Sequence, residues 1–213
     1  MKVATEPQSV AELLPQVRSC TRCHTAPRRQ PPLPHKPRPV LQLSQHAPIL
    51  IAGQAPGTRV HRSGRPFTDP SGDRLRSWLG LNEQVFYDCS RLAIVPMGFC
   101  FPGLDAKGGD LPPRRECAAT WHDRLFAGRP PFALKLVIGR YARDYHLPQH
   151  RTERLTDTIR RQLVDPEAAV SGGAVLLPHP SWRNNAWLKR NPEFEQLLLP
   201  VIKRRVHDLL ASR

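Results

Sequence analysis

The chain has 213 residues, of which 39% are hydrophobic, and this length suits one α/β domain (1–213) but is short for two. Its 32 Lys and Arg exceed its 18 Asp and Glu, giving a formal net charge of +14. No run approaches the roughly 20 apolar residues of a membrane span, and the first residues lack the apolar core of a secretory signal. We therefore expect a cytoplasmic monomer with no membrane partner. The excess of positive charge predicts that it binds a polyanion such as DNA; the alternative is a basic surface that only maintains solubility.

Short apolar runs and longer amphipathic segments alternate along the chain. The apolar runs have strand-like composition and end at Gly, Pro or polar residues. They cover 48–53, 92–97, 133–139 and 174–178. Helical spacing occurs over 10–20, 72–79, 113–126, 140–146, 154–163 and 192–210. Ser71 and Asn191 stand where N-caps belong, and Pro192 suits a first helical position. The alternation predicts a three-layer α/β/α fold with a four-stranded parallel sheet.

Two segments have the composition of loops. Many of the 24 prolines lie within 27–47, a basic stretch that contains few apolar residues to bury. The segment 101–113 is rich in Gly and Pro. Both are predicted to be irregular, and 27–47 is predicted to be a surface loop.

The chain contains five cysteines, and four of them have the spacing of metal ligands. Cys20 and Cys23 form a C-x-x-C pair at the end of the first predicted helix. Cys100 follows the second strand and Cys117 lies in the next helix, so the two can be neighbours in space. Four thiolates can hold a zinc ion or a [4Fe–4S] cluster, and spacing does not choose between them. Cys89 has no partner at such spacing and is interpreted as an ordinary residue.

Three short motifs follow predicted strands. The first strand leads into a turn, Gly53-Gln54-Ala55-Pro56-Gly57, and then into Gly64-Arg65-Pro66-Phe67. A glycine-rich turn at the end of a parallel strand brings backbone N–H groups close to a ligand. His179, Pro180 and Ser181 follow the fourth strand directly, and Trp182 and Arg183 come next. An aromatic residue beside a cation suits DNA contact; for Trp187, core packing and insertion into a base stack both remain open.

The cysteine spacing and these motifs resemble the uracil-DNA glycosylase superfamily, in particular the iron–sulfur group often called family four. The resemblance implies a [4Fe–4S] cluster on Cys20, Cys23, Cys100 and Cys117. It also implies that Gly53, Gln54 and Ala55 line a base pocket, where Phe67 stacks on the extruded base. His179 would stabilise the departing base, and Ser181, Trp182 and Arg183 would contact DNA.

The chain departs from family four at the positions that usually activate water and read the base. Gln54 replaces a glutamate, Val60 and His61 replace a Glu-Asp pair, and Ala55 stands where related families have Asp or Asn. The ionisable residues left to orient water are Asp69 and His61. Pro96 replaces the asparagine that pairs with uracil, and proline has no side-chain donor or acceptor.

The leading hypothesis is a hydrolytic DNA glycosylase that flips and removes a damaged base, uracil or a related deaminated base. A second hypothesis is an iron–sulfur DNA-binding protein that keeps the fold but lacks catalysis. The third is a zinc-stabilised α/β protein that binds another anionic ligand.

Overall fold

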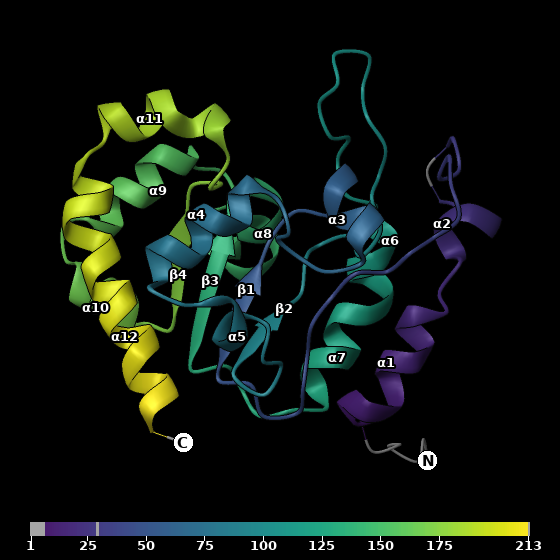
Figure 1. Ribbon diagram of the computed structural model, residues 1–213, viewed down its shortest axis with the longest axis horizontal. Coiled ribbons are helices and arrows are strands. Elements are labelled where there is room, and N and C mark those ends of the chain that lie inside the picture. The colour runs from purple at the N-terminus through teal and green to yellow at the C-terminus, as the bar shows by residue number, and fades with distance from the viewer. Residues whose placement is uncertain (1–6, 29, 213) are drawn as a thin grey trace.

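The computed structural model describes residues 7–28 and 30–212 and contains a four-stranded parallel sheet. The strands are β1 (Ile49–Ala52), β2 (Leu92–Ile94), β3 (Leu134–Ile138) and β4 (Ala174–Leu177), in the order β2-β1-β3-β4. All four predicted strands are confirmed, with slightly shorter bounds. Figure 1 shows them side by side at the centre, with α10 and α12 beyond β4 and α1 and α7 beyond β2. The prediction of a parallel sheet flanked by helices is therefore confirmed.

The register places the carboxyl ends of the strands at one edge of the sheet. Ile51 pairs with Ile94, Ala52 with Val137, and Ile138 with Leu177. Beyond β1 and β2 the contact continues, because Met97 N donates to Gly53 O and Gly98 N donates to Gln54 O, both at 2.9 Å. Pro96 has no N–H to join a ladder, which explains why β2 ends earlier than predicted.

Four of the predicted helices are present with similar bounds: α1 (Val10–Arg18), α4 (Pro70–Leu79), α8 (Gly139–His146) and α9 (Leu155–Gln162). The predicted cap Ser71 is wrong. Asp69 caps α4, since its carboxylate accepts from Gly72 N at 3.2 Å, and Pro70 takes the first helical position. Helix α8 packs against β3 and β4, and α9 packs against β4.

The two remaining predicted helices contain π-helical turns. Helix α6 (Arg115–Cys117), turn η1 (Ala118–His122) and α7 (Asp123–Ala127) follow one another where 113–126 was expected. Turn η4 (Phe194–Leu198) leads into α12 (Leu199–Ala211). Asn191 is not a cap, because its Oδ1 accepts from Arg160 Nη2 at 3.3 Å and its Nδ2 donates to Trp187 O at 2.8 Å.

Several short elements were not predicted: α2 (Arg22–Thr25), α3 (Thr58–Ser63), α5 (Glu83–Phe86), α10 (Pro166–Ser171), α11 (Asn185–Arg190), and the 3₁₀ turns η2 (Pro148–His150) and η3 (Trp182–Asn184). None exceeds six residues, too few to show an apolar period. No helix in the described part of the chain is long and apolar enough to cross a membrane.

The Pro-rich segment 27–47 is more than a surface loop. It is irregular as predicted, but Leu33, Val40, Leu43 and Ala47 are each at most 4% exposed. Gln42 forms an antiparallel bridge with Ile94, at the edge of β2. The segment therefore covers the free side of β2, and most of its few apolar residues are buried.

Candidate active site

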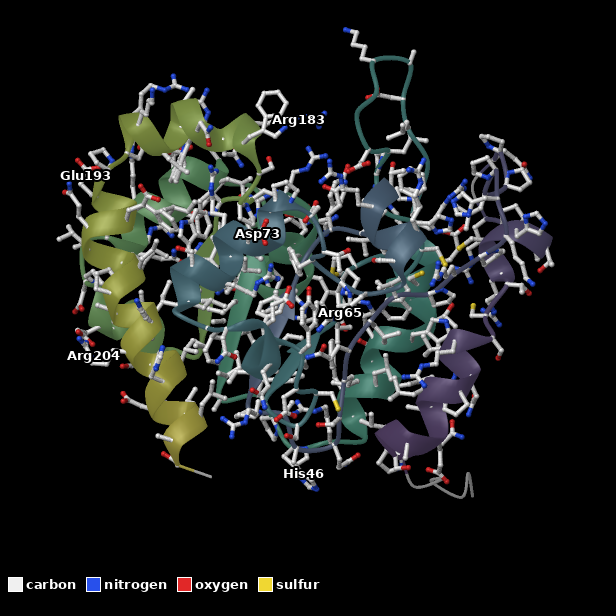
Figure 2. All side chains as sticks on the ribbon, viewed as in Figure 1. His46, Arg65, Asp73, Arg183, Glu193 and Arg204 are labelled. Carbon is white, nitrogen blue, oxygen red and sulfur yellow. The ribbon has the colours of Figure 1, made fainter. Side chains whose placement is uncertain are left out.

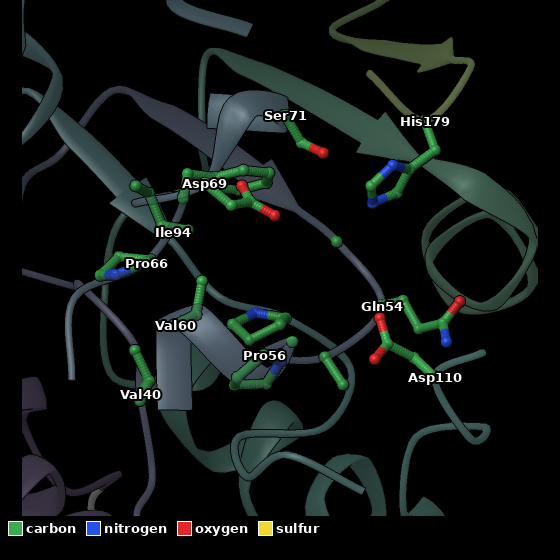
Figure 3. A pocket seen from close by; sticks show the side chains of 15 residues that line it. Val40, Gln54, Pro56, Val60, Pro66, Asp69, Ser71, Ile94, Asp110 and His179 are labelled. Atoms are coloured by element: carbon green, nitrogen blue, oxygen red, sulfur yellow. The ribbon is translucent and has the colours of Figure 1, made fainter. Parts of the chain in front are cut away.

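A small pocket lies at the carboxyl ends of β1, β2 and β4 (Figure 3). It encloses about 80 Å³ and adjoins a wider groove of about 770 Å³. The residues that line both are Gln54, Ala55, Gly57, Asp69, Ser71, Asp110 and His179. A ligand can therefore pass from the groove into the pocket at the edge of the sheet where parallel α/β folds bind ligands.

The turn after β1 forms the floor of the pocket. Gly53 lies so close to Phe67 that a Cβ atom on the glycine would be 3.8 Å from the ring. The side chain of Gln54 donates to Leu111 O at 3.4 Å, so its amide is engaged with the segment 101–113. Gly53, Gln54, Ala55 and Phe67 all line the pocket, as the sequence analysis expected.

Phe67 is held in an uncommon backbone conformation. Its φ is +54°, and among the described residues it is the only non-glycine residue with positive φ. Its carbonyl accepts from Tyr87 Oη at 3.1 Å and from Arg76 Nη1 at 3.3 Å. A Cβ atom on Gly72 would lie 1.8 Å from the same carbonyl oxygen. These contacts fix the segment that carries the ring.

The two donors to Phe67 are themselves supported. Arg76 is 8% exposed and pairs with Asp73 at 2.5 Å and with Glu83 at 3.7 Å. The Arg65 guanidinium lies 3.4 Å from the centre of the Tyr87 ring. Burial raises the pKa of Tyr87, so its hydroxyl stays a hydrogen-bond donor. Nothing in the sequence separates Arg76 and Tyr87 from other polar residues.

His179 points into the pocket from the end of β4 (Figure 3). Ser181 N donates to His179 Nδ1 at 3.2 Å, so Nδ1 is an acceptor and the proton of the neutral ring is on Nε2. Burial lowers the pKa of His179, and the Arg183 charge lowers it further, whereas Asp69 opposes the shift. Near neutral pH the pocket therefore receives an N–H donor from an uncharged imidazole.

The two residues expected to orient water are placed differently. Asp69 lines the pocket while also capping α4. His61 lines neither the pocket nor the groove; its ring lies 4.3 Å from that of His35 and 5.8 Å from that of Phe101. Burial lowers the pKa of His61, and the charge of His35 adds to this. The structure thus brings Asp69 and not His61 to the site.

A second carboxyl group in the pocket, Asp110, was missed by the sequence analysis. It comes from the irregular segment 101–113 and lines both the pocket and the groove. Withdrawal from water raises the pKa of Asp110, with Asp69 adding to the effect and Arg183 opposing it. A single acidic residue in a Gly- and Pro-rich loop has no periodic pattern, so only the fold reveals its position.

The groove carries cations and an exposed aromatic side chain. Arg59, Arg140 and Arg183 are among the residues that line it. Ser181 and Trp182 line it too, and Trp182 is 72% exposed. Figure 2 shows Arg183 projecting near the amino end of α11. Trp187, by contrast, packs on Phe194 at 5.9 Å and donates to Thr156 Oγ1 at 2.8 Å, which favours the core interpretation.

The cysteine side chains from distant parts of the chain come together. The thiols of Cys23 and Cys117 are close enough to shift each other's pKa, and Cys23 packs with Cys100 and Leu33 in a small buried cluster. Cys20 is half-buried and lies within electrostatic range of Cys100, whereas Cys89 is exposed. Burial raises the pKa of Cys100 to about 12. Among the described residues, no three His, Cys, Asp or Glu side chains have the geometry of a bound metal ion.

One family model matches most of the chain. The family model described as "Uracil DNA glycosylase superfamily" matches residues 41–203. The matched region contains the sheet, every pocket residue except Val40, and Cys100 and Cys117, but not Cys20 and Cys23. The chain belongs to the uracil DNA glycosylase superfamily.

Proposed function

We propose that the protein is a DNA glycosylase that flips a damaged base, uracil or a related deaminated base, and hydrolyses its N-glycosidic bond. The observation that carries the proposal is the shared pocket of Phe67 and His179, in which an aromatic ring and an imidazole N–H donor face the same small space. An enzyme that acts on a base inside a duplex needs such a pocket for the extruded nucleotide.

The site chemistry follows from the two side chains. Phe67 stacks on the base, and the hydrogen bonds to its carbonyl hold its backbone at the pocket while its ring packs edge-on against Phe86. As the glycosidic bond breaks, negative charge develops on the base, and the preorganised Nε2–H of His179 stabilises it. The Asp69 carboxylate faces the positive charge that develops on the sugar.

In this pocket, no side chain at position 96 can form a bidentate contact with the edge of the base. Pro96 lines the pocket but offers no side-chain donor or acceptor, and the Gln54 amide is engaged with Leu111. Backbone groups of the turn 53–57 and the Ser71 hydroxyl remain to read the base. This favours a pocket that accepts more than one deaminated base.

The DNA partner is proposed to lie in the groove. Arg59, Arg140 and Arg183 supply charge for phosphates, and exposed Trp182 stands where a side chain can fill the gap left by the extruded base. The net charge of +14 favours the same partner.

We also propose a [4Fe–4S] cluster on Cys20, Cys23, Cys100 and Cys117. The support is the thiol donor set, which suits iron–sulfur chemistry, and the buried position of Cys23 beside both Cys100 and Cys117. A protein purified anaerobically should be brown and contain about four iron atoms per chain, as such a cluster requires. Stoichiometric zinc without visible absorbance would contradict the cluster and leave the base-release proposal intact.

The function is tested by incubating purified protein with oligonucleotides that carry uracil, hypoxanthine, xanthine or only intact bases, followed by alkali. Strand cleavage at a deaminated base and not in the intact strand is the expected result. Base release should occur without strand cleavage before alkali, since the reaction is hydrolysis. DNA binding without any base release would instead favour the non-catalytic DNA-binding protein.

A further inference from the structure

We infer that Asp110 is a catalytic residue that holds and deprotonates the attacking water, an inference that rests on the proposed glycosylase function. Figure 3 shows three ionisable side chains, Asp69, Asp110 and His179, pointing into the same space from different sides. Asp110 stands where the pocket meets the groove, because it lines both. Water can therefore reach it while the base occupies the pocket.

The loop that carries Asp110 forms a hydrogen-bonded hairpin. Leu104 and Asp110 form an antiparallel bridge, and Leu111 N donates to Gly103 O at 2.9 Å. Asp105 Oδ1 closes the tip by accepting from Lys107 N and Gly109 N, each at 2.8 Å. The hydrogen bond from Gln54 to Leu111 O then ties the hairpin to the turn after β1. These contacts set the position of the Asp110 backbone relative to the pocket.

The turn after β1 leaves room for this carboxylate. Ala55 projects only a methyl group, and a Cβ atom added at Gly57 would lie 3.6 Å from Asp110 Oδ2. A larger side chain at either position would compete for the space at the mouth of the pocket. The small residues of the turn and the acidic hairpin are thus complementary in shape.

Asp110 and Asp69 differ in the hydrogen bonds that their carboxylates accept from the protein. Asp69 accepts a hydrogen bond from Gly72 N, which fixes its orientation and uses one oxygen. Within the described part of the chain, the Asp110 side chain accepts no hydrogen bond from the protein. Both of its oxygens can therefore receive a proton from water. Its raised pKa makes it a better base than an ordinary aspartate.

The step balances without a further reactant. The bond between C1′ and the base nitrogen breaks, and the base leaves with the electron pair as an anion beside His179 Nε2–H. The water oxygen bonds to C1′, and one of its protons passes to the Asp110 carboxylate. Solvent later protonates the base and removes the proton from Asp110, which returns the site to its starting state.

The test compares matched Asp→Asn variants in single-turnover assays with the substrate that wild type cleaves best. Asp110→Asn should slow base release about a hundredfold, within the range for loss of a general base. Asp208→Asn, an exposed carboxylate on α12, serves as the charge control and should keep the wild-type rate. Binding to an uncleavable strand should be unchanged or slightly tighter in Asp110→Asn, because the substitution removes a negative charge near DNA.

Two further readouts separate water activation from a structural effect. The wild-type rate should rise with pH as Asp110 ionises, above the usual aspartate range near pH 4, and this rise should be missing in Asp110→Asn. Added formate should restore part of the activity of Asp110→Ala by supplying a carboxylate. Formate should not restore His179→Ala, which lacks an N–H donor instead.

The outcomes distinguish the inference from the proposed function. Equal rates for Asp110→Asn and Asp208→Asn would overturn the role of Asp110 while the glycosylase activity stands. A hundredfold loss in Asp69→Asn together with a wild-type rate in Asp110→Asn would assign the water to Asp69. If wild type releases no base from any strand, the proposed function fails and the role of Asp110 fails with it.

Discussion

The pocket at the strand ends and the cysteine region are stabilised in different ways. In the pocket, neighbouring protein atoms fix the key groups: Phe67 through Arg76 and Tyr87, and His179 through Ser181 N. The segment around Cys20 and Cys23 follows α1, which packs into the main core through Val10, Leu13 and Val17, and this segment is held by contacts between residues distant in sequence. Among these, Arg28 N donates to Glu116 Oε1 at 2.9 Å and Leu33 N donates to Cys23 O at 3.0 Å.

Under the proposed function, the two regions have different tasks within one fold. A pocket that needs no reorganisation can stabilise charge as soon as the base arrives. A region assembled from segments distant in sequence gains most from a group that joins them, as bound metals commonly do. The pocket should therefore respond to substitutions through rate, and the cysteine region through stability and iron content.

The sharpest test of this division is Cys117→Ser. Cys117 is buried, and its thiol interacts with Cys23 and accepts from Phe99 N at 3.5 Å. If it is a cluster ligand, the variant should lose nearly all iron, and thermal unfolding should begin at the N-terminal segment. Iron content, visible absorbance and limited proteolysis followed by mass spectrometry measure this. Cys89→Ser, at an exposed position, is the control and should keep wild-type iron; loss of iron there would contradict the ligand set.

The second test acts on the pocket alone. His179→Ala removes the Nε2–H donor and should lower the single-turnover rate of base release by roughly ten- to a thousandfold, the range for one preorganised donor. Iron content and DNA affinity should stay close to wild type, because the side chain lies in the pocket and not near the cysteines. A variant that cleaves at the wild-type rate would remove His179 from the mechanism.

The sequence predicted the parts of the fold that depend on local pattern. The strands were found because buried parallel strands are continuous apolar runs. Phe67 and His179 were expected in the pocket because their short motifs resemble those of the uracil-DNA glycosylase superfamily. His61 was expected at the site because Val60 and His61 stand where family four has a Glu-Asp pair, so that His61 was one of two ionisable residues left to orient water. It lies on α3 next to Val60, which lines the pocket, and adjacent helical residues point about 100° apart.

The rest depended on contacts between distant segments. Tyr87 reaches Phe67 across 20 positions, and Gln54 reaches Leu111 across 57. Neither pairing leaves a pattern in the sequence, since each uses one polar side chain from a short helix or a loop. The cap of α4 was misplaced by two positions because Ser71 and Asp69 are both good caps, and Pro70 decides between them.

A smaller effect should come from Tyr87→Phe, which removes one of two hydrogen bonds to the Phe67 carbonyl and keeps the ring under Arg65. The loss of one hydrogen bond, about 1 kcal/mol, corresponds to a roughly fivefold decrease in the rate of base release. The rate should decrease when the target base is paired. The decrease should be smaller when the target base is unpaired, because less stacking energy is then needed to extrude the base. Equal loss with both substrates would indicate that Tyr87 supports the fold rather than the orientation of Phe67.

The smallest effect is expected at the rim of the groove, where Arg183 is exposed beside Trp182, with its guanidinium 5.8 Å from the centre of the Trp182 ring. If Arg183 contacts one phosphate, Arg183→Ala should weaken binding a few-fold for every sequence and reduce the slope of log affinity against log salt by about 0.9. Fluorescence anisotropy with uncleavable strands at several salt concentrations measures both quantities.

Arg204→Ala is the matched control, since Arg204 pairs with Glu167 on α10 and lies far from Arg183 in Figure 2. The two variants remove the same net charge, so an equal change in slope would mean that total charge, and not a contact at the groove, governs binding. A change confined to Arg183→Ala, with the choice of base unaltered, would place the phosphate contact at the groove beside the pocket.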